Sequence, residues 1–442
     1  MREQTAFRAR QTKLLHMLKP GSIALIPAGS LATRSNDTEF PFRQDSQFKY
    51  LLGLEEHDAL LVLSNLDGKM RTILFCQEKN ALAELWSGKR IGVERAKELF
   101  NADEAYPHAN WKEKLAELLV GHKSLYMDFF SHDTFFTQVK SLLYQLSLTK
   151  KRKEPSPSEF VNLAPLLGRL RLIKDSNEIE FMKRAAEITN RAHRGAMALA
   201  KAGKNEKDIN AAMEYLFQRD GGGNAYESIV AGGENALVLH YIENDCALRD
   251  GDLILIDAGA QFNLYASDVS RTFPVSGKFS KEQRELYQLV LDAQKSCIQM
   301  VGPGKTLGEI HAEAGKVLLQ GLIELGILTG TLEEHQKDDS LKRYYPHGTS
   351  HWLGLDVHDN GPYRDSKGEE IGLAPGMVLT VEPGLYFQLD DDTVPSKYKG
   401  IGIRIEDDIL VTEKGYENLT AAIPKEIKEV EEACASEVTL FC

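Results

Sequence analysis

The chain has 442 residues, which is too long for one ordinary domain and suits two. Its apolar fraction of 42% is typical of globular proteins, and no stretch approaches the roughly 18 consecutive apolar residues of a membrane span. The formal net charge of −12 disfavours nucleic acid and anionic membrane surfaces as partners. We therefore expect a protein of two domains that binds no nucleic acid and no membrane.

Cysteine usage and the N-terminal residues indicate a compartment. The five cysteines are Cys76, Cys246, Cys297, Cys434 and Cys442. They form no C-x-x-C pair and are odd in number, so reduced structural thiols are the simplest interpretation. Residues 1–8 contain no apolar run of the kind found in secretory signals. Both features favour a cytoplasmic location.

The first part of the chain alternates short apolar runs with helical stretches. Residues 23–26, 59–63 and 72–76 are predicted strands, and residues 110–120 and 134–146 are predicted helices. This alternation is typical of a small α/β domain.

A domain boundary is predicted near residue 172. Residues 150–158 are charged and then rich in Pro and Ser, which is typical of a linker, and a long helix is predicted at residues 178–200. We therefore expect an N-terminal domain over residues 1–172 and a second domain over residues 173–442.

The second part of the chain contains an internal repeat. In each copy two helices are joined by a segment that begins with Gly-Lys, at residues 203–209 and 304–310. A strand follows that begins with a glycine and ends six residues later in a carboxylate, Asp257 or Glu382. Each of these carboxylates is followed two residues later by another glycine.

Each copy also holds a second carboxylate and a histidine. The first copy contains Asp268 and His240, and the second contains Glu406 and His351. Two similar units of this kind predict a pseudo-two-fold domain with one shared site at its axis.

Carboxylates at the ends of apolar strands need a compensating charge. Burying one costs several kcal/mol unless it is paired or bound to a metal, and for a single residue a salt bridge is the simpler explanation. Four carboxylates in matched pairs, without a matching set of buried cations, favour two divalent metal ions. An oxygen-rich set with one imidazole favours Mn²⁺, with Co²⁺, Fe²⁺ or Zn²⁺ as substitutes. Two such ions activate a water and polarise a carbonyl, which is typical of a hydrolase.

Residues 347–359 contain three histidines, His347, His351 and His358. One histidine alone is more often a satisfied core residue than a ligand, but three in this segment, shortly before Glu382, favour a site. The residues alone leave open which histidine is the metal ligand.

Several segments resemble those of the pita-bread metallopeptidases. They include TVEPGLY at residues 380–386 and SHWLGLDVHD at residues 350–359, together with residues 255–259, 265–274 and 400–408. Two N-terminal segments, residues 33–48 and 85–90, extend the resemblance over most of the chain. Within the family, the chain is most similar to the bacterial Xaa-Pro aminopeptidases, the aminopeptidase P group.

This resemblance implies roles for individual residues. The five metal ligands that it implies are Asp257, Asp268, His351, Glu382 and Glu406. Glu382 is also the implied general base, and His240 and His358 are the implied catalytic histidines, which bind substrate and the tetrahedral intermediate. The further substrate contacts that it implies are Tyr386, Arg404, Trp86 and Arg364. It also implies that His347 is a structural histidine and that Asp37 reaches the site of a neighbouring subunit.

The implied fold is α/β (α+β), a small N-terminal α/β domain followed by a pseudo-two-fold pita-bread catalytic domain. The implied activity is hydrolysis of the N-terminal Xaa-Pro bond of peptides by a hydroxide that bridges two metal ions. A homo-oligomer, a tetramer or dimer built through the N-terminal domains, is also implied. Prolidase, which cuts only Xaa-Pro dipeptides, methionine aminopeptidase and a non-catalytic binding protein of the same fold are the alternatives.

Overall fold

The structure is a computed structural model that describes residues 2–148 and 156–437. The chain divides into two compact units, Met1–Arg171 and Leu172–Cys442. Most of the predicted linker, residues 150–155, lies outside the described residues, as does Cys442. Within the described ranges, no helix combines the length and apolar character needed to cross a membrane.

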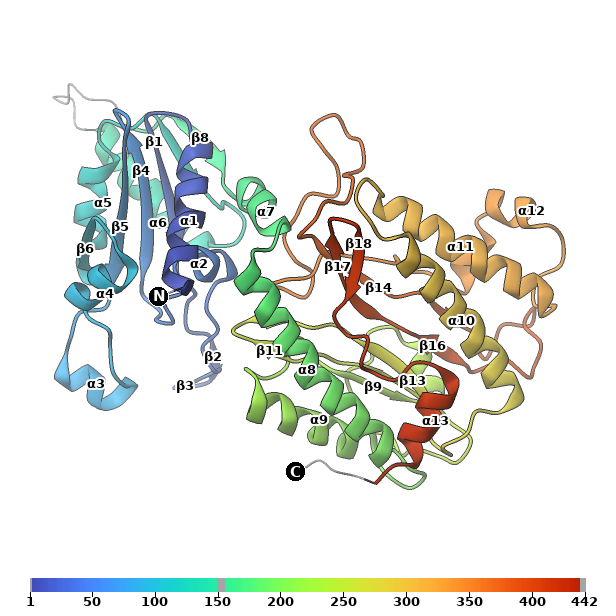
Figure 1. Cartoon of the computed structure of the whole chain (residues 1–442). Coiled ribbons are helices and arrows are strands. Elements are labelled where there is room, and N and C mark those ends of the chain that lie inside the picture. Colours follow the sequence, from blue (N-terminus) through green and yellow to red (C-terminus); the bar gives the residue numbers. More distant parts are fainter. Residues whose placement is uncertain (1, 149–155, 438–442) are drawn as a thin grey trace. The chain divides into compact units, whose positions relative to one another are not determined.

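The N-terminal unit is built on one mixed six-stranded sheet (Figure 1). In spatial order its strands are β6 (Glu104–Pro107), β5 (Lys69–Cys76), β4 (Leu60–Leu66), β1 (Ser22–Pro27), β7 (Ser124–Met127) and β8 (Glu159–Asn162). The central strand β1 pairs antiparallel with β4 and parallel with β7. The three predicted strands of this region are confirmed as parts of β1, β4 and β5.

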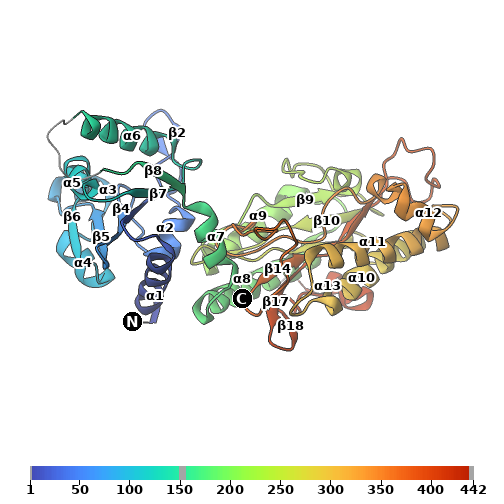
Figure 2. The same cartoon turned by 90° about the horizontal axis from the view of Figure 1, so that it is seen from above.

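Helices cover both faces of this sheet, and Figure 2 shows α1 and α6 on opposite sides of it. The α-helices of this unit, not all of which cover the sheet, are α1 (Arg2–Met17), α2 (Ser46–Leu51), α3 (Ala81–Ser87), α4 (Val93–Phe100), α5 (Trp111–Leu119), α6 (Asp133–Ser147) and α7 (Ala164–Leu172). A small hairpin is formed by β2 (Thr33–Ser35) and β3 (Thr38–Glu39). Leu115 of α5 and Val139 of α6 pack with Ile23 and Val62 of the sheet in one buried cluster. The predicted α/β character of this region is confirmed.

Two helix pairs form the outer layer of the C-terminal unit. They are α8 (Ser176–Leu199) with α9 (Glu206–Asp220), and α10 (Lys281–Met300) with α11 (Leu307–Glu324), and each pair lies side by side (Figure 1). The Gly-Lys segments of the repeat end in capping boxes, Asn205 with Asp208 and Thr306 with Glu309. The shared sequence pattern therefore encodes the start of the second helix in each copy, because both orphan backbone donors are satisfied there.

The inner layer of this unit consists of short antiparallel sheets. One contains β13 (Ser270–Pro274), β10 (Leu253–Asp257) and β9 (Ile229–Gly232), and its counterpart contains β14 (Val378–Val381), β17 (Asp407–Thr412) and β18 (Gly415–Asn418). The remaining strands and α-helices are β11 (Gln261–Phe262), β12 (Tyr265–Ala266), β15 (Gly384–Tyr386), β16 (Gly402–Arg404), α12 (Leu332–Lys337) and α13 (Ile427–Ala435). Residues of both helix pairs and both sheets join in one hydrophobic core.

Strand register shows how the two copies correspond. Asp257 pairs with Ser270, whereas Val381 pairs with Asp407 and Gly384 with Arg404, which sets Glu382 opposite Glu406. Asp257 and Glu382 are the equivalent strand carboxylates of the two copies. Their partners across the strands, Ser270 and Glu406, therefore occupy equivalent positions. Asp268, two residues before Ser270, corresponds to Arg404, so the second carboxylates of the two copies do not occupy equivalent positions.

The glycine two residues after each strand carboxylate permits a close backbone approach. A Cβ atom on Gly259 would lie 1.7 Å from the carbonyl oxygen of Ser267, and one on Gly384 would lie 2.9 Å from that of Ile403. A side chain at either position would push the paired segment away. These glycines let the segments that carry the second carboxylates come close to the first.

Candidate metal centre

A cavity of about 390 Å³ in the C-terminal unit is lined by residues of both repeats. It contains all five residues predicted as metal ligands, Asp257, Asp268, His351, Glu382 and Glu406. His240, His347, His358 and Arg404 also line it. The structure therefore brings together side chains that are far apart in the sequence.

The four carboxylates lie where the backbone enters or leaves a sheet. Asp257 is the last residue of β10, and Glu382 directly follows β14. Asp268 lies between β12 and β13, and Glu406 lies between β16 and β17. Their backbones are fixed by the sheets while their side chains reach the cavity.

Asp268, His351 and Glu406 form the tightest group, with one ligand atom from each lying within 4.8 Å of the others. The Nε2 atom of His351 is 3.3 Å from Asp268 Oδ2 and 3.7 Å from Glu382 Oε1. Its Nδ1 atom lies 3.1 Å from the carbonyl oxygen of Trp352. This carbonyl fixes the ring and directs Nε2 into the carboxylate group, as is usual for a metal-bound histidine.

The cavity has an excess of negative charge in the metal-free chain. Burial, reinforced by the Asp268 and Glu382 carboxylates, raises the pKa of Glu406 well above its ordinary range. Burial likewise raises the pKa of Glu382 to about 7. Among the described residues that line the cavity, Arg404 alone has a permanent positive charge. Divalent cations would supply the missing charge, so the residues present fit a metal centre.

Tyr226 is a cavity residue that the sequence did not reveal. Its hydroxyl oxygen lies 2.6 Å from Asp257 Oδ1 and also 2.6 Å from Asp268 Oδ1. A hydroxyl has one proton and can donate to only one of these acceptors. Two carboxylates gathered on one donor are a further sign that a cation belongs between them.

The position of Tyr226 follows from a close backbone approach. It comes shortly after Gly221, where a Cβ atom would lie 2.6 Å from the carbonyl oxygen of Gln261. Gly222 donates its N–H to the same carbonyl at 2.8 Å. Gly221, Gly222 and Gly223 indicate a turn in the sequence, but they do not identify which later residue reaches the cavity.

Arg404 links one ligand to a polar chain at the side of the cavity. Its guanidinium donates to Asp257 Oδ2 at 2.6 Å and to the hydroxyl of Tyr386 at 2.8 Å. Tyr386 in turn lies 2.9 Å from Nε2 of His347. Burial lowers the pKa of His347 to about 4, so this imidazole is neutral near pH 7. This series of polar contacts holds Asp257 in place, because Arg404 is itself fixed by Tyr386.

His240 and His358 lie on the exposed side of the cavity. The ring of His358 lies edge-on to that of His351, with 4.5 Å between centroids. Partial burial and the neighbouring His351 charge lower the pKa of His358. Both histidines are placed to meet a ligand that enters the cavity.

Three other residues named from the sequence lie elsewhere. Arg364 is on an exposed loop, where it donates to the carbonyl oxygen of Gly368 at 2.8 Å and faces Glu370 at 3.7 Å, and it does not line the cavity. Trp86 and Asp37 belong to the N-terminal unit, and both are exposed there.

The chain is similar to known metallopeptidases over most of its length. The pattern of metallopeptidase family M24 matches residues 180–413, and that of the aminopeptidase P N-terminal domain matches residues 7–126. An Xaa-Pro aminopeptidase of Haemophilus influenzae is 42% identical over 426 residues, covering 96% of each chain.

Solved structures are similar over the same extent. Aminopeptidase PepP of Pseudomonas aeruginosa gives a TM-score of 0.95 at 40% identity over 98% of both chains. Zinc-substituted aminopeptidase P of Escherichia coli in complex with product gives a TM-score of 0.94 at 40% identity, again over 98% of both chains.

Proposed function

The chain belongs to metallopeptidase family M24 and carries the N-terminal domain of the aminopeptidase P group, and from this membership we propose that it is an Xaa-Pro aminopeptidase. It hydrolyses the bond between the first residue of a peptide and a proline at the second position. The observation that carries this function is the cavity in which four carboxylates and one imidazole from both repeats converge. Two divalent ions, when bound by Asp257, Asp268, His351, Glu382 and Glu406, would supply a water of lowered pKa and a Lewis acid for the scissile carbonyl.

Glu382 is the general base of the proposal. It lines the cavity together with the other four proposed metal ligands. A carboxylate at this position can accept a proton from the attacking water and give it to the departing proline nitrogen.

His240 and His358 are the proposed contacts for the substrate carbonyl. They lie on the exposed side of the cavity, and an imidazole N–H of either can donate to the oxygen that becomes negative in the transition state. Arg404 and Tyr386 keep Asp257 oriented, and Arg404 also faces the cavity, where it can contact the peptide.

Proline at the second position suits this arrangement. An Xaa-Pro bond has no amide hydrogen, so a peptidase that must bind that hydrogen cannot act on it. Here the polar groups act on the carbonyl oxygen and on the free N-terminal amine, which an acidic side chain of the cavity can bind. Recognition of that amine confines cleavage to the first bond.

We extend the proposal to properties beyond the reaction. The metal is Mn²⁺, which oxygen-rich sites favour, with Co²⁺, Fe²⁺ or Zn²⁺ as substitutes. The protein is a cytoplasmic homotetramer, or a dimer. Trp86 and Arg364 contribute to substrate binding, and Asp37 reaches the site of a neighbouring subunit. Its domains are residues 1–172 and 173–442, a division that the two compact units support.

A peptide panel tests the substrate class. The Mn²⁺-loaded protein is assayed with Xaa-Pro dipeptides, with Xaa-Pro-Xaa tripeptides and longer peptides, and with matched peptides that have Ala second. We expect cleavage of the proline tripeptides and longer peptides. Activity on dipeptides alone would indicate prolidase, and removal of N-terminal Met regardless of proline would indicate methionine aminopeptidase. Absence of bound metal together with absence of activity would indicate a binding protein.

Replacing the proposed base tests the mechanism. E382Q keeps the size of the side chain but loses its proton acceptor, so kcat is expected to fall by about 10²–10⁴-fold. E206Q is the matched control, because Glu206 is also buried in this unit but bonds to Tyr241 and to the backbone of Gly232 and Cys246. Near-normal turnover by E382Q would contradict the assignment.

A further inference from the structure

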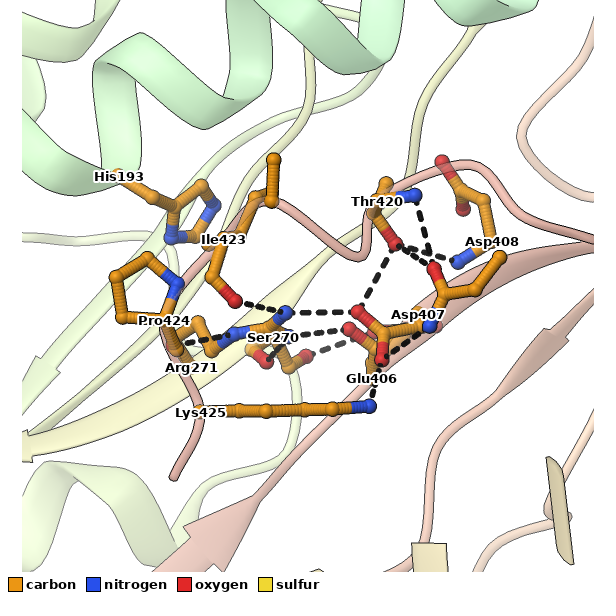
Figure 3. A network of polar contacts seen from close by, with 12 residues as sticks. His193, Ser270, Arg271, Glu406, Asp407, Asp408, Thr420, Ile423, Pro424 and Lys425 are labelled. Carbon is orange, nitrogen blue, oxygen red and sulfur yellow. Dashed lines mark hydrogen bonds and ion pairs between the residues drawn. The ribbon is translucent and has the colours of Figure 1, made fainter. Parts of the chain in front are cut away.

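Polar contacts join the two repeats directly behind the metal ligands. They involve the residues that follow Asp268, at the start of β13, and those that follow Glu406, at the start of β17. Figure 3 shows Ser270 and Arg271 of the first repeat facing Glu406 and Asp407 of the second. These residues lie outside the lining of the cavity, except for Glu406.

Asp408 of the second repeat holds Asp268 of the first. The backbone N–H of Asp268 donates to the Asp408 carboxylate, at 3.1 Å from Oδ1 and 3.2 Å from Oδ2. The hydroxyl of Ser267 donates to the same carboxylate at 2.8 Å. Asp408 is itself fixed, because its N–H donates to Thr420 Oγ1 at 3.0 Å. These contacts fix the backbone of Asp268 and therefore the position from which its side chain extends to the cavity.

An equivalent contact is made by a residue of the first repeat to the backbone of the second. Thr272 corresponds to Asp408, and Arg404 corresponds to Asp268. The backbone N–H of Arg404 donates to Thr272 Oγ1 at 3.2 Å. The same bracing therefore occurs twice across the pseudo-two-fold axis, which indicates a built feature of the fold.

Ser270 of the first repeat holds Glu406 of the second. Its hydroxyl donates to Glu406 Oε2 at 2.8 Å, and the Glu406 N–H donates to the Ser270 carbonyl oxygen at 3.0 Å. The same hydroxyl accepts a hydrogen bond from Arg404 Nε at 2.7 Å. Because that donor occupies one lone pair, the hydroxyl proton is directed at Glu406.

Arg271 and Asp407 stabilise the contact between Ser270 and Glu406 (Figure 3). Both side chains are fully buried, and Arg271 Nη2 donates to Asp407 Oδ1 at 2.7 Å. Arg271 Nη1 donates to the carbonyl oxygens of Ser270 at 3.0 Å and Glu406 at 2.5 Å. One guanidinium thus binds the backbone of both repeats at the ligand.

We propose that Asp408 and Ser270 are positioning residues of the metal centre, each supplied by one repeat and each holding a ligand of the other. Together they fix the spacing between Asp268 and Glu406, which belong to the tightest ligand group. The inference deepens the proposed function, because it rests on the ligand set assigned there, but it is tested on metal binding rather than on turnover.

The test is the affinity of the metal-free full chain for Mn²⁺, measured by equilibrium dialysis and metal analysis. S270A and D408A are each expected to weaken binding by about 10–100-fold, the usual effect of removing a group that orients a metal ligand. D408N keeps an oxygen that accepts the Asp268 N–H and an amide that donates to Ser267. It is therefore expected to restore most of the affinity, which separates position from charge.

Two control variants lie in the N-terminal unit. Asp128 is buried and accepts hydrogen bonds from a backbone N–H and a serine hydroxyl, as Asp408 does, and Ser64 is a buried serine whose hydroxyl is 2.9 Å from His122 Nε2. D128A and S64A are expected to bind Mn²⁺ as the wild type does. Thermal unfolding of each metal-free variant reports folding, and if D408A does not fold, S270A decides, since it removes a single oxygen atom.

The outcomes separate this proposal from the proposed function. Wild-type affinity in S270A and D408A would overturn it, and so would a D408N variant as weak as D408A. A wild-type chain that binds Mn²⁺ but leaves Xaa-Pro peptides intact would overturn the proposed function alone. A wild-type chain that binds no metal would overturn both.

Discussion

At the scale of single residues, Glu382 and His351 make the metal-free chain sensitive to pH. Burial raises the pKa of Glu382 to about 7. Burial opposes protonation of His351, but the hydrogen bond and charge of Asp268 raise its pKa to about 9. Each pKa is higher in the folded state than in the unfolded state, so the stability that protonation contributes is lost as the pH rises through the folded-state pKa.

The expected result is a fall in the unfolding midpoint of the chelator-treated chain from pH 6.5 to pH 9, since His351 has its ordinary pKa at 6.5 and its folded value at about 9. Bound Mn²⁺ replaces the protons, so the midpoint of the metal-loaded chain should not fall in this way. Thermal scans with chelator and with Mn²⁺ measure both curves. A metal-free midpoint that stays level or rises over this interval would contradict the assignment.

Single residues also show how far the sequence could be interpreted. The proposed ligands carry distinctive motifs, and the structure brings them into one cavity. Tyr226, Ser270 and Asp408 carry no comparable signal, because a hydroxyl or carboxylate that braces a ligand has the same sequence appearance as one that caps a turn. The roles of Ser270 and Asp408 depend on contacts between repeats, and that of Tyr226 depends on its contacts with Asp257 and Asp268 within one repeat. Only the folded chain reveals these contacts.

At the scale of elements, a buried ion pair fixes the loop that carries His358. Lys174, just before α8, lies 3.0 Å from Asp359, and both side chains are almost inaccessible, at 1% and 2%. Removing one partner of a buried ion pair typically costs about 3–5 kcal/mol. K174M is therefore expected to lower the unfolding midpoint by roughly 6–10 °C.

The control for this variant is an exposed pair in the same unit. Lys183 lies 2.7 Å from Glu417 with side chains 40% and 46% exposed, so K183M should change stability by at most about 1 kcal/mol. Thermal unfolding of both variants, at one metal concentration, gives the comparison. Equal midpoints for K174M and K183M would show that the buried pair does not stabilise the loop.

The start of a helix can be predicted where the residues that define it lie close together in the sequence. The helix starts at Asn205 and Thr306 could be anticipated because each capping box is contained within a few residues. Strand register could not be, because it depends on how far apart two segments lie in the chain and on the loops between them. That is why Asp268 and Glu406 looked like matched positions in the sequence but pair differently in the sheets.

At the scale of the whole molecule, Trp86 of the N-terminal unit is one of the residues proposed to contribute to substrate binding. Trp86 lies on α3 and is 85% exposed, so its replacement should not affect folding. W86A is expected to raise KM for Xaa-Pro peptides by loss of aromatic contact area, while Mn²⁺ affinity stays the same. L85A is the matched control, because Leu85 is 77% exposed on the same helix. An unchanged KM in W86A would remove Trp86 from the substrate site.

The bracing between repeats has a consequence for how such a chain can evolve. Ser270 and Glu406 are 136 positions apart in the sequence, yet a hydrogen bond joins them beside the proposed metal centre. A substitution at such a contact in one half would displace a ligand in the other half. The two halves are therefore no longer interchangeable copies. Selection on either segment therefore acts on both of them together.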